Sequence, residues 1–406
     1  MIYGHRLGLV FGEINMFNEE TCKRCGLCLI MCPFLEMPKR EAKAEMEQMI
    51  ETKESQIVSK NCAGCTYCDI ICPTRSNPSH LREEIIARRN SDKGRACLSL
   101  FTDEVPFNVM TIGLEFDPQE QLKDLDTYLN PVPSKEVFYL GCSLSCIYTD
   151  LAKTELLKRL PKVGGIKYCC GIYAHDFGEE EARIKGRQLL EEFEKLGTDR
   201  LITFCTGCDD IIGTVYPKII PEFDIEIVNI ATYLLQEHQE GKIAFTHPIN
   251  KRVTFHDPCK WRMLEPEVRE NSRKLLQSMG VDLVEMKHNR EKSLCCGTPL
   301  VVSGRNRSLA SEIAERRVFE AKEIGAEAIV VSCTGCFTGL VEKAEEQNIE
   351  VYYITELAQM AIGEKPLHRL KEMKDQLTNN IIKKVSENPG ILKKKYVIKN
   401  GEVIPV

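Results

Sequence analysis

The stretch LITFCTGCDDI, residues 201–211, returns later in the chain as IVVSCTGCFTG, residues 329–339. Each copy begins with a short run of mainly apolar residues, which is typical of a buried strand. A CxxC turn follows, so both cysteines are predicted to lie at the end of a strand and the start of a helix. Backbone N–H groups and the helix dipole favour an anionic thiolate or cluster at such a position.

The similarity between the two copies extends in both directions from this unit. The corresponding segments are residues 137–146 and 253–261, residues 168–171 and 294–297, and residues 225–236 and 349–360. Short apolar runs alternate with helical stretches in both copies, which favours βα units and a largely parallel sheet. The sequence therefore predicts one α/β fold used twice, over residues 136–247 and residues 248–365.

Each repeat carries five cysteines in the same order: a single cysteine, an adjacent pair and a CxxC. They are Cys142, Cys169, Cys170, Cys205 and Cys208 in the first repeat, and Cys259, Cys295, Cys296, Cys333 and Cys336 in the second. Adjacent cysteines cannot easily adopt the geometry of a relaxed disulfide. A tetrahedral zinc ion or an ordinary cubane needs only four thiols. Five thiols therefore predict an unusual iron–sulfur site in each repeat.

Two further groups of four cysteines precede the repeats, and both have the spacing CxxCxxCxxxCP. This spacing is typical of proteins with two [4Fe–4S] cubanes, in which the fourth cysteine of each group ligates the other cluster. The predicted ligand sets are Cys22, Cys25, Cys28 and Cys72 for one cubane, and Cys62, Cys65, Cys68 and Cys32 for the other. A pair of zinc sites is the alternative, although zinc modules rarely hold four cysteines so close together.

Composition narrows the class of protein. The 406 residues include 20 cysteines, nearly all in these groups, and clustered cysteines indicate metal or redox centres in a reducing compartment. A net charge of −6 disfavours nucleic acid as a partner. No apolar run is long enough to span a membrane, and the run at residues 7–12 is too short for a secretory signal. We therefore expect a cytoplasmic protein, which a partner subunit can hold at the inner face of a membrane.

The remaining segments frame these regions. Helix-forming residues 39–60 join the two cysteine groups, so residues 1–95 are predicted to form one mainly helical unit. Residues 96–135 are predicted to be a linker. Residues 366–406 carry an excess of Lys and Arg, which indicates either a solvated end or a docking segment for an acidic partner. There is no GxGxxG motif, so we expect no flavin or nicotinamide on this chain and electrons from another subunit.

The second repeat resembles the CCG motif of heterodisulfide reductases, in which 31–39 and then 35–36 residues separate the cysteines. Here 35 residues separate Cys259 from Cys295, and 36 separate Cys296 from Cys333. Over residues 21–363 the arrangement is similar to the D subunits of these enzymes and to related iron–sulfur subunits of anaerobic redox complexes. In fold terms we predict a ferredoxin-like region followed by two tandem Rossmann-like α/β CCG repeats.

The resemblance implies two noncubane [4Fe–4S] clusters, one per CCG repeat, which face each other across a cleft and cleave a disulfide bound between them. The five cysteines of the second repeat would form the candidate disulfide site. The first repeat departs from the pattern, because only 26 residues separate Cys142 from Cys169 and 34 separate Cys170 from Cys205. Cys146 offers an alternative thiol one helical turn from Cys142. An ordinary cubane is therefore an alternative at the first site.

The resemblance also implies an oxidoreductase subunit of a hetero-oligomeric complex with a small thiol or disulfide substrate. Electrons would come from a membrane cytochrome b or a flavoprotein and pass through the cubanes to the CCG clusters. One alternative is an electron relay without disulfide chemistry, serving an acyl-CoA reductase or a quinone-linked oxidoreductase. A zinc scaffold is the third class of function that the cysteines allow.

Several polar residues stand beside the cysteines of the repeats. Lys260 and Arg262 follow Cys259, where they either hold the anionic end of a thiol substrate or balance the charge of a cluster. His256 and His175 either relay protons for disulfide reduction or pack locally. Cys97 belongs to no motif and is interpreted as an inert buried thiol.

Overall fold

Two four-stranded parallel sheets carry the two repeats in the computed structural model, which describes residues 16–105, 107–263 and 266–406. The first sheet has the strand order β3-β2-β4-β5, and the second has the equivalent order β7-β6-β8-β9. Their strands are β2 (Glu136–Leu140), β3 (Lys162–Gly164), β4 (Arg200–Thr203) and β5 (Glu226–Asn229), then β6 (Arg252–Phe255), β7 (Asp282–Leu283), β8 (Ala328–Val331) and β9 (Glu350–Tyr353). The shared strand order and parallel pairing confirm that one α/β fold is used twice.

The central strands β4 and β8 place the CxxC cysteines. Both strands are largely or fully buried, as their apolar sequences predict. Each leads through one or two residues to a cysteine that caps the following helix, Cys205 before α11 (Thr206–Asp210) and Cys333 before α17 (Thr334–Glu346). Ligands of open α/β sheets bind at the carboxyl ends of the strands, which is where both motifs lie.

Helices cover both sheets. In the first repeat they are α8 (Gly141–Cys146), α9 (Ile172–His175), α10 (Glu179–Leu196), α11, α12 (Tyr216–Ile219) and α13 (Ile230–Gln239). In the second they are α14 (Pro266–Ser278), α15 (Thr298–Val302), α16 (Arg307–Glu323), α17 and α18 (Ile354–Ala361). The helix after the first CxxC is interrupted by a π-helical turn at Ile211–Val215, whereas α17 is continuous. Pro217, which has no backbone N–H to donate, stands in α12 directly after that turn.

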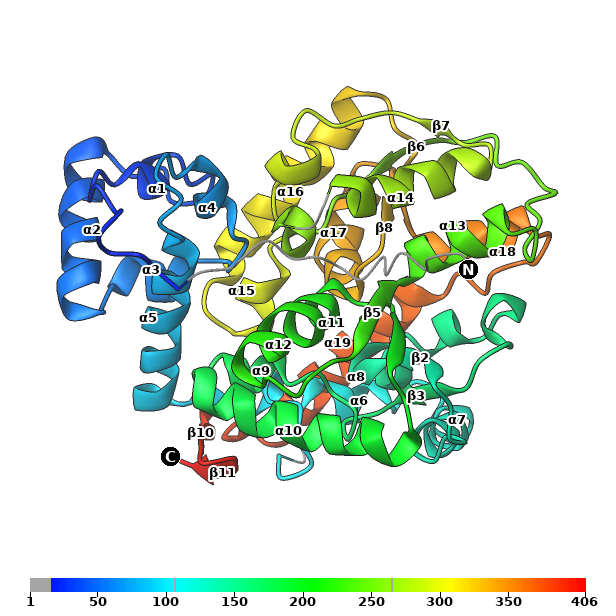
Figure 1. Ribbon diagram of the computed structural model, residues 1–406, viewed down its shortest axis with the longest axis horizontal. Coiled ribbons are helices and arrows are strands. Elements are labelled where there is room, and N and C mark those ends of the chain that lie inside the picture. Colours follow the sequence, from blue (N-terminus) through cyan, green and yellow to red (C-terminus); the bar gives the residue numbers. More distant parts are fainter. Residues whose placement is uncertain (1–15, 106, 264–265) are drawn as a thin grey trace, which may run out of the picture.

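The two cysteine groups near the N-terminus lie in a small helical unit beside the second repeat (Figure 1). Its helices are α1 (Leu27–Ile30), α2 (Lys39–Thr52), α3 (Gln56–Asn61), α4 (Tyr67–Ile71) and α5 (Pro78–Lys93). Helix α16 of the second repeat holds this unit through two contacts. The Arg316 guanidinium donates to the carbonyl of Pro33 at 2.6 Å, and the Asn306 side chain donates to that of Asn61 at 2.8 Å.

The segments before and after the repeats pack on the first repeat and on α5. The earlier one contains α6 (Val109–Gly113) and α7 (Pro118–Leu129). The later one contains α19 (Leu370–Glu387), which packs on α6, and a hairpin of β10 (Lys395–Lys399) and β11 (Glu402–Pro405). Strand β10 also pairs antiparallel with β1 (Arg95–Ala96), which directly follows α5. The C-terminal hairpin thus lies against the N-terminal unit (Figure 1).

No helix of the described residues is long and apolar enough to cross a membrane. Residues 7–12, the apolar run judged too short for a secretory signal, lie outside the described residues. The architecture is therefore a mixed one, with a helical unit followed by two α/β repeats that have parallel sheets. Its finer assignment as ferredoxin-like and Rossmann-like, and the domain bounds, stay predictions.

Candidate functional site

The first predicted cubane set converges in the fold. Its members Cys22, Cys25, Cys28 and Cys72 line one small cavity, to which Cys72 comes from the other cysteine group. Burial raises the pKa of the Cys28 thiol, and so do its neighbours Cys72 and Cys22, while Arg82 lowers it. Cys25 is exposed and Cys22 is half-buried, so this set lies at the protein surface.

The second predicted cubane set is deeper in the unit. Burial raises the pKa of the Cys65 thiol to about 12, and the thiols of Cys259 and Cys32 add to this effect. Cys68 neighbours Cys62 and Cys65 in the same way. Arg82, buried between the two sets, donates to the carbonyl of Cys28 at 2.7 Å. The chain thus exchanges one cysteine between its two groups, as the predicted ligand sets require.

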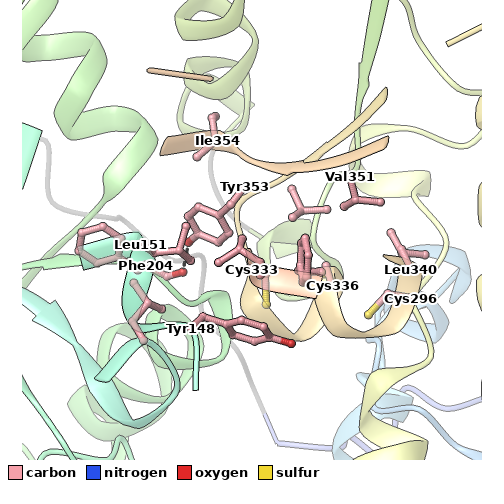
Figure 2. Packing of buried hydrophobic residues seen from close by; sticks show 14 of the residues in the cluster. Tyr148, Leu151, Phe204, Cys296, Cys333, Cys336, Leu340, Val351, Tyr353 and Ile354 are labelled. Carbon is pink, nitrogen blue, oxygen red and sulfur yellow. Dashed lines mark hydrogen bonds between the residues drawn. The ribbon is translucent and has the colours of Figure 1, made fainter. Parts of the chain in front are cut away.

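The five cysteines of the second repeat form a continuous series of contacting thiols. Cys259 contacts Cys295, which contacts Cys296, and the series continues through Cys336 to Cys333. All five are less than a tenth exposed. Figure 2 shows Cys333 and Cys336 at the start of α17, with Cys296 facing them from a neighbouring segment. A fully buried group of thiol donors fits an iron–sulfur cluster, and five such thiols exceed the needs of tetrahedral zinc.

The five cysteines of the first repeat also come together. The Sγ atoms of Cys169 and Cys142 lie 3.6 Å apart, and contacts continue from Cys169 through Cys170 and Cys208 to Cys205. The shorter spacing of this repeat therefore does not prevent the five thiols from meeting. Cys146 lies near Cys169, and burial raises the pKa of its thiol to about 12. Cys97 is buried away from these groups, with its Sγ 3.5 Å from the carbonyl oxygen of Ile391.

The two five-thiol groups meet each other at their CxxC motifs. The thiol of Cys205 contacts the thiol of Cys333, and the Thr334 hydroxyl oxygen lies 4.0 Å from the Sγ of Cys205. Tyr353 supports this junction, because its hydroxyl lies between the carbonyl oxygens of Phe204 and Ser332, the residues that precede the two CxxC motifs. Figure 2 shows Tyr353 and Phe204 side by side next to Cys333.

Further contacts between the repeats surround the junction. The Trp261 indole N–H donates to Asp209 Oδ2 at 2.7 Å, and burial raises the pKa of that carboxyl to about 7. Tyr148 packs edge-on against Phe337 with ring centroids 5.5 Å apart, and its hydroxyl lies 2.6 Å from that of Thr338. Nothing in the sequence pattern marks Tyr353, Asp209 or Tyr148 as parts of a site, because each fits an ordinary apolar or helical context.

Lys260 and Arg262 both have partners within the protein. The Lys260 ammonium lies 2.7 Å from Asp210 and 3.9 Å from Glu83. Arg262 donates to the carbonyl oxygens of Cys65 at 3.1 Å and Ser293 at 2.8 Å. These contacts favour structural and charge-balancing roles over the capture of a substrate anion. Arg262 also joins the second cubane set to the second CCG site.

The glycine after each adjacent cysteine pair has a conformation that other residues rarely adopt. Gly297 has φ +84°, and a Cβ atom there would lie 2.6 Å from the backbone oxygen of Ala310. We expect Gly297→Ala to lower the free energy of unfolding by about 2–3 kcal/mol, from the positive φ and the backbone clash together. Urea unfolding followed by the fluorescence of Trp261, the single tryptophan of the chain, measures this loss.

Gly325→Ala is the matched control for that substitution. Gly325 has φ +67° but no atom within 4 Å of a Cβ, so its alanine variant carries only the backbone strain. Equal losses for the two variants would show that the contact with Ala310 contributes nothing.

Comparison with known proteins supports the same division of the chain. Residues 137–212 and 253–341 match the family described as cysteine-rich domain, CCG, and residues 14–73 match the 4Fe-4S dicluster domain. The D subunit of dihydromethanophenazine:CoB–CoM heterodisulfide reductase from Methanosarcina barkeri is 25% identical, over 86% of this chain and 95% of that protein. EtfAB:quinone oxidoreductase from Syntrophomonas wolfei is 24% identical, over 86% and 58% of the two chains. The B subunit of fumarate reductase (CoM/CoB) from Methanothermobacter marburgensis is 27% identical, over 75% and 61%.

Proposed function

The chain belongs to the iron–sulfur proteins of the heterodisulfide reductase family, in which a 4Fe-4S dicluster domain precedes two CCG domains, and from this premise we propose that it reduces a disulfide bound between its two CCG sites. The contact between Cys205 and Cys333 carries the proposal. Two sites that meet at a point can each engage one sulfur of the same disulfide. Cleavage consumes two electrons and two protons and yields two thiols.

We propose that the electrons follow the order of the thiol groups in the fold. The exposed first cubane set is placed to receive them from a partner. The second set follows, and its Cys65 neighbours Cys259 of the second CCG site. Clusters held by these thiols would supply transfer of one electron at a time. The chain's own contribution is to hold the groups in contact, as Arg262 does between Cys65 and Ser293.

The proposed ligands are the four cysteines of each cubane set and the five of each CCG repeat. The donor sets that converge in the fold support this assignment, including the exchange of Cys72 and Cys32 between groups. At the first CCG site an ordinary cubane remains the alternative, since four of its thiols would suffice. The proposed partner is a membrane cytochrome b or a flavoprotein, and the proposed place is the cytoplasm or the inner face of a membrane.

A relay without disulfide chemistry is the second candidate function. Two relatives with the same kind of iron–sulfur chain are named for quinone and fumarate reduction. In this role the electron path stays the same, and the final acceptor is a partner protein.

We expect a paramagnetic signal when coenzyme M or coenzyme B is added to the oxidised, anaerobically purified protein. Low-temperature EPR measures it, because a substrate thiol that reaches a CCG cluster changes the spin state of that cluster. Silence with both thiols, in protein that carries its full iron, would contradict the disulfide proposal and favour the relay. A colourless protein without iron would contradict both and favour a zinc scaffold.

A further inference from the structure

His256 is a fully buried polar residue at the second CCG site. It follows β6, and its backbone N–H donates to the carbonyl of Val330 at 2.9 Å. One ring nitrogen of His256 and the sulfur atoms of Cys296 and Cys336 all lie within 4.8 Å of one another. This position allows three roles: a ligand of a metal, a carrier of protons, or a hydrogen-bond donor to sulfur.

Arg317 of α16 decides which of its nitrogens carries the proton. The Arg317 Nε donates to His256 Nδ1 at 2.9 Å. Arg317 is itself fully buried and is held by the carbonyl of His288 at 2.6 Å and the carboxylate of Glu320 at 2.7 Å. An arginine nitrogen can only donate, so Nδ1 must accept. The neutral imidazole therefore carries its proton on Nε2.

The Nε2–H group has no nitrogen or oxygen acceptor among the described residues. A buried donor without an acceptor costs about 1–3 kcal/mol, so such groups in folded proteins almost always have one. Its neighbours are thiol sulfurs, and the interaction with Cys296 is the one that both side chains share. A cysteine that ligates a cluster carries its sulfur as a thiolate, which is a good acceptor for N–H.

We infer that His256 donates a hydrogen bond from Nε2 to Cys296 and thereby raises the reduction potential of the second CCG cluster. The inference rests on the ligand set proposed above. A donor to sulfur stabilises the reduced cluster, which is the more negative state, more than the oxidised one. The same proton prevents Nε2 from binding iron. The Arg317 donor keeps Nδ1 occupied, so His256 is not free to relay protons.

The first CCG repeat lacks an equivalent donor. Leu140 stands in the position that corresponds to His256 when β2 is aligned with β6. The hydroxyl of the neighbouring Tyr139 lies near the thiols of that site but donates to the carbonyl oxygen of Tyr168. The two repeats therefore differ in the hydrogen bonds that they offer to sulfur, although their folds are the same.

Two substitutions separate the donor from the packing of the ring. His256→Leu removes both ring nitrogens, whereas His256→Gln can accept from Arg317 with its carbonyl oxygen and donate to Cys296 with its amide. EPR-monitored redox titration of the full, cluster-loaded chain measures the midpoint potential. We expect His256→Leu to lower the midpoint of the second CCG cluster by about 59 mV, which is a tenfold change for one electron. His256→Gln should shift it much less, and neither should move the cubanes. An unmoved midpoint in His256→Leu would overturn the inference.

Pulsed EPR of the wild-type chain labelled with ¹⁵N-histidine covers the case in which His256→Leu loses its cluster. Weak coupling to one nitrogen is the result expected for a hydrogen-bonded ring. Strong coupling would identify a ligand, and no coupling would show that the ring makes no contact, so either result would overturn the inference. Absence of any cluster signal from the second site would instead contradict the proposed function.

Discussion

Replacing Cys295 by alanine is expected to remove the iron of the second CCG site while both cubanes stay loaded. Cys295 contacts both Cys259 and Cys296, so its loss interrupts the series of five thiols. The residue is 1% exposed, so water has little access to take its place. Iron analysis should show a loss of about four irons per chain. The EPR signal induced by substrate thiol should disappear with them.

Cys97→Ala is the matched control for this experiment. Cys97 is also 1% exposed but lies outside every predicted ligand set. Its alanine variant should keep all of its iron and its response to thiols. The ligand assignment fails if Cys295→Ala retains the full iron content, or if Cys97→Ala loses as much. The cubane signals, recorded in the same samples, report whether the remainder of the chain is intact.

Replacing Arg273 by methionine is expected to destabilise the second repeat by about 3–5 kcal/mol. Arg273 forms two parallel hydrogen bonds to Asp257, at 2.7 and 2.8 Å, and both side chains are less than 5% exposed. The substitution leaves the Asp257 carboxylate buried without its main cation. Asp257 also accepts from the backbone N–H of Arg290, so the damage reaches the segment before Cys295. Urea unfolding followed by Trp261 fluorescence measures the loss.

Two further variants interpret that loss. Arg252→Met removes an exposed ion pair with Asp282 and should cost less than about 1 kcal/mol. Asp257→Asn in the Arg273→Met background removes the unpaired charge and should recover part of the stability. If the double variant is no more stable than Arg273→Met alone, then lost packing of the Arg273 side chain, rather than an uncompensated charge, accounts for the effect.

Spacing alone was enough to predict the parts of the molecule that depend on it. The CxxC units define the strand–helix corners at Cys205 and Cys333, because period and turn chemistry are local properties. The duplicated strand order follows from the repeat. The exchange of Cys72 and Cys32 between the cubane sets is contained in the CxxCxxCxxxCP pattern. Each of these features is written in a short stretch of sequence.

Other features depend on residues that are far apart in sequence. Tyr353 reads as part of an apolar strand, yet its hydroxyl joins the backbone before both CxxC motifs. The partner of His256 is Arg317, which the helical pattern of α16 presents as one basic residue among several. The excess of Lys and Arg at residues 366–406 describes the surface of that segment and not its buried face, where Leu370 and Met373 pack. A single sequence carries no record of such pairings.

The pairing of β1 with β10 sets an order for the biogenesis of the chain. Residues 95–96 leave the ribosome early, but their partners at residues 395–396 emerge only near the end of synthesis. The N-terminal unit therefore spends most of translation without its final strand contact. During that interval its eight cysteines are open to the machinery that delivers iron and sulfide. Maturation of the cubanes can thus precede closure of the fold over them.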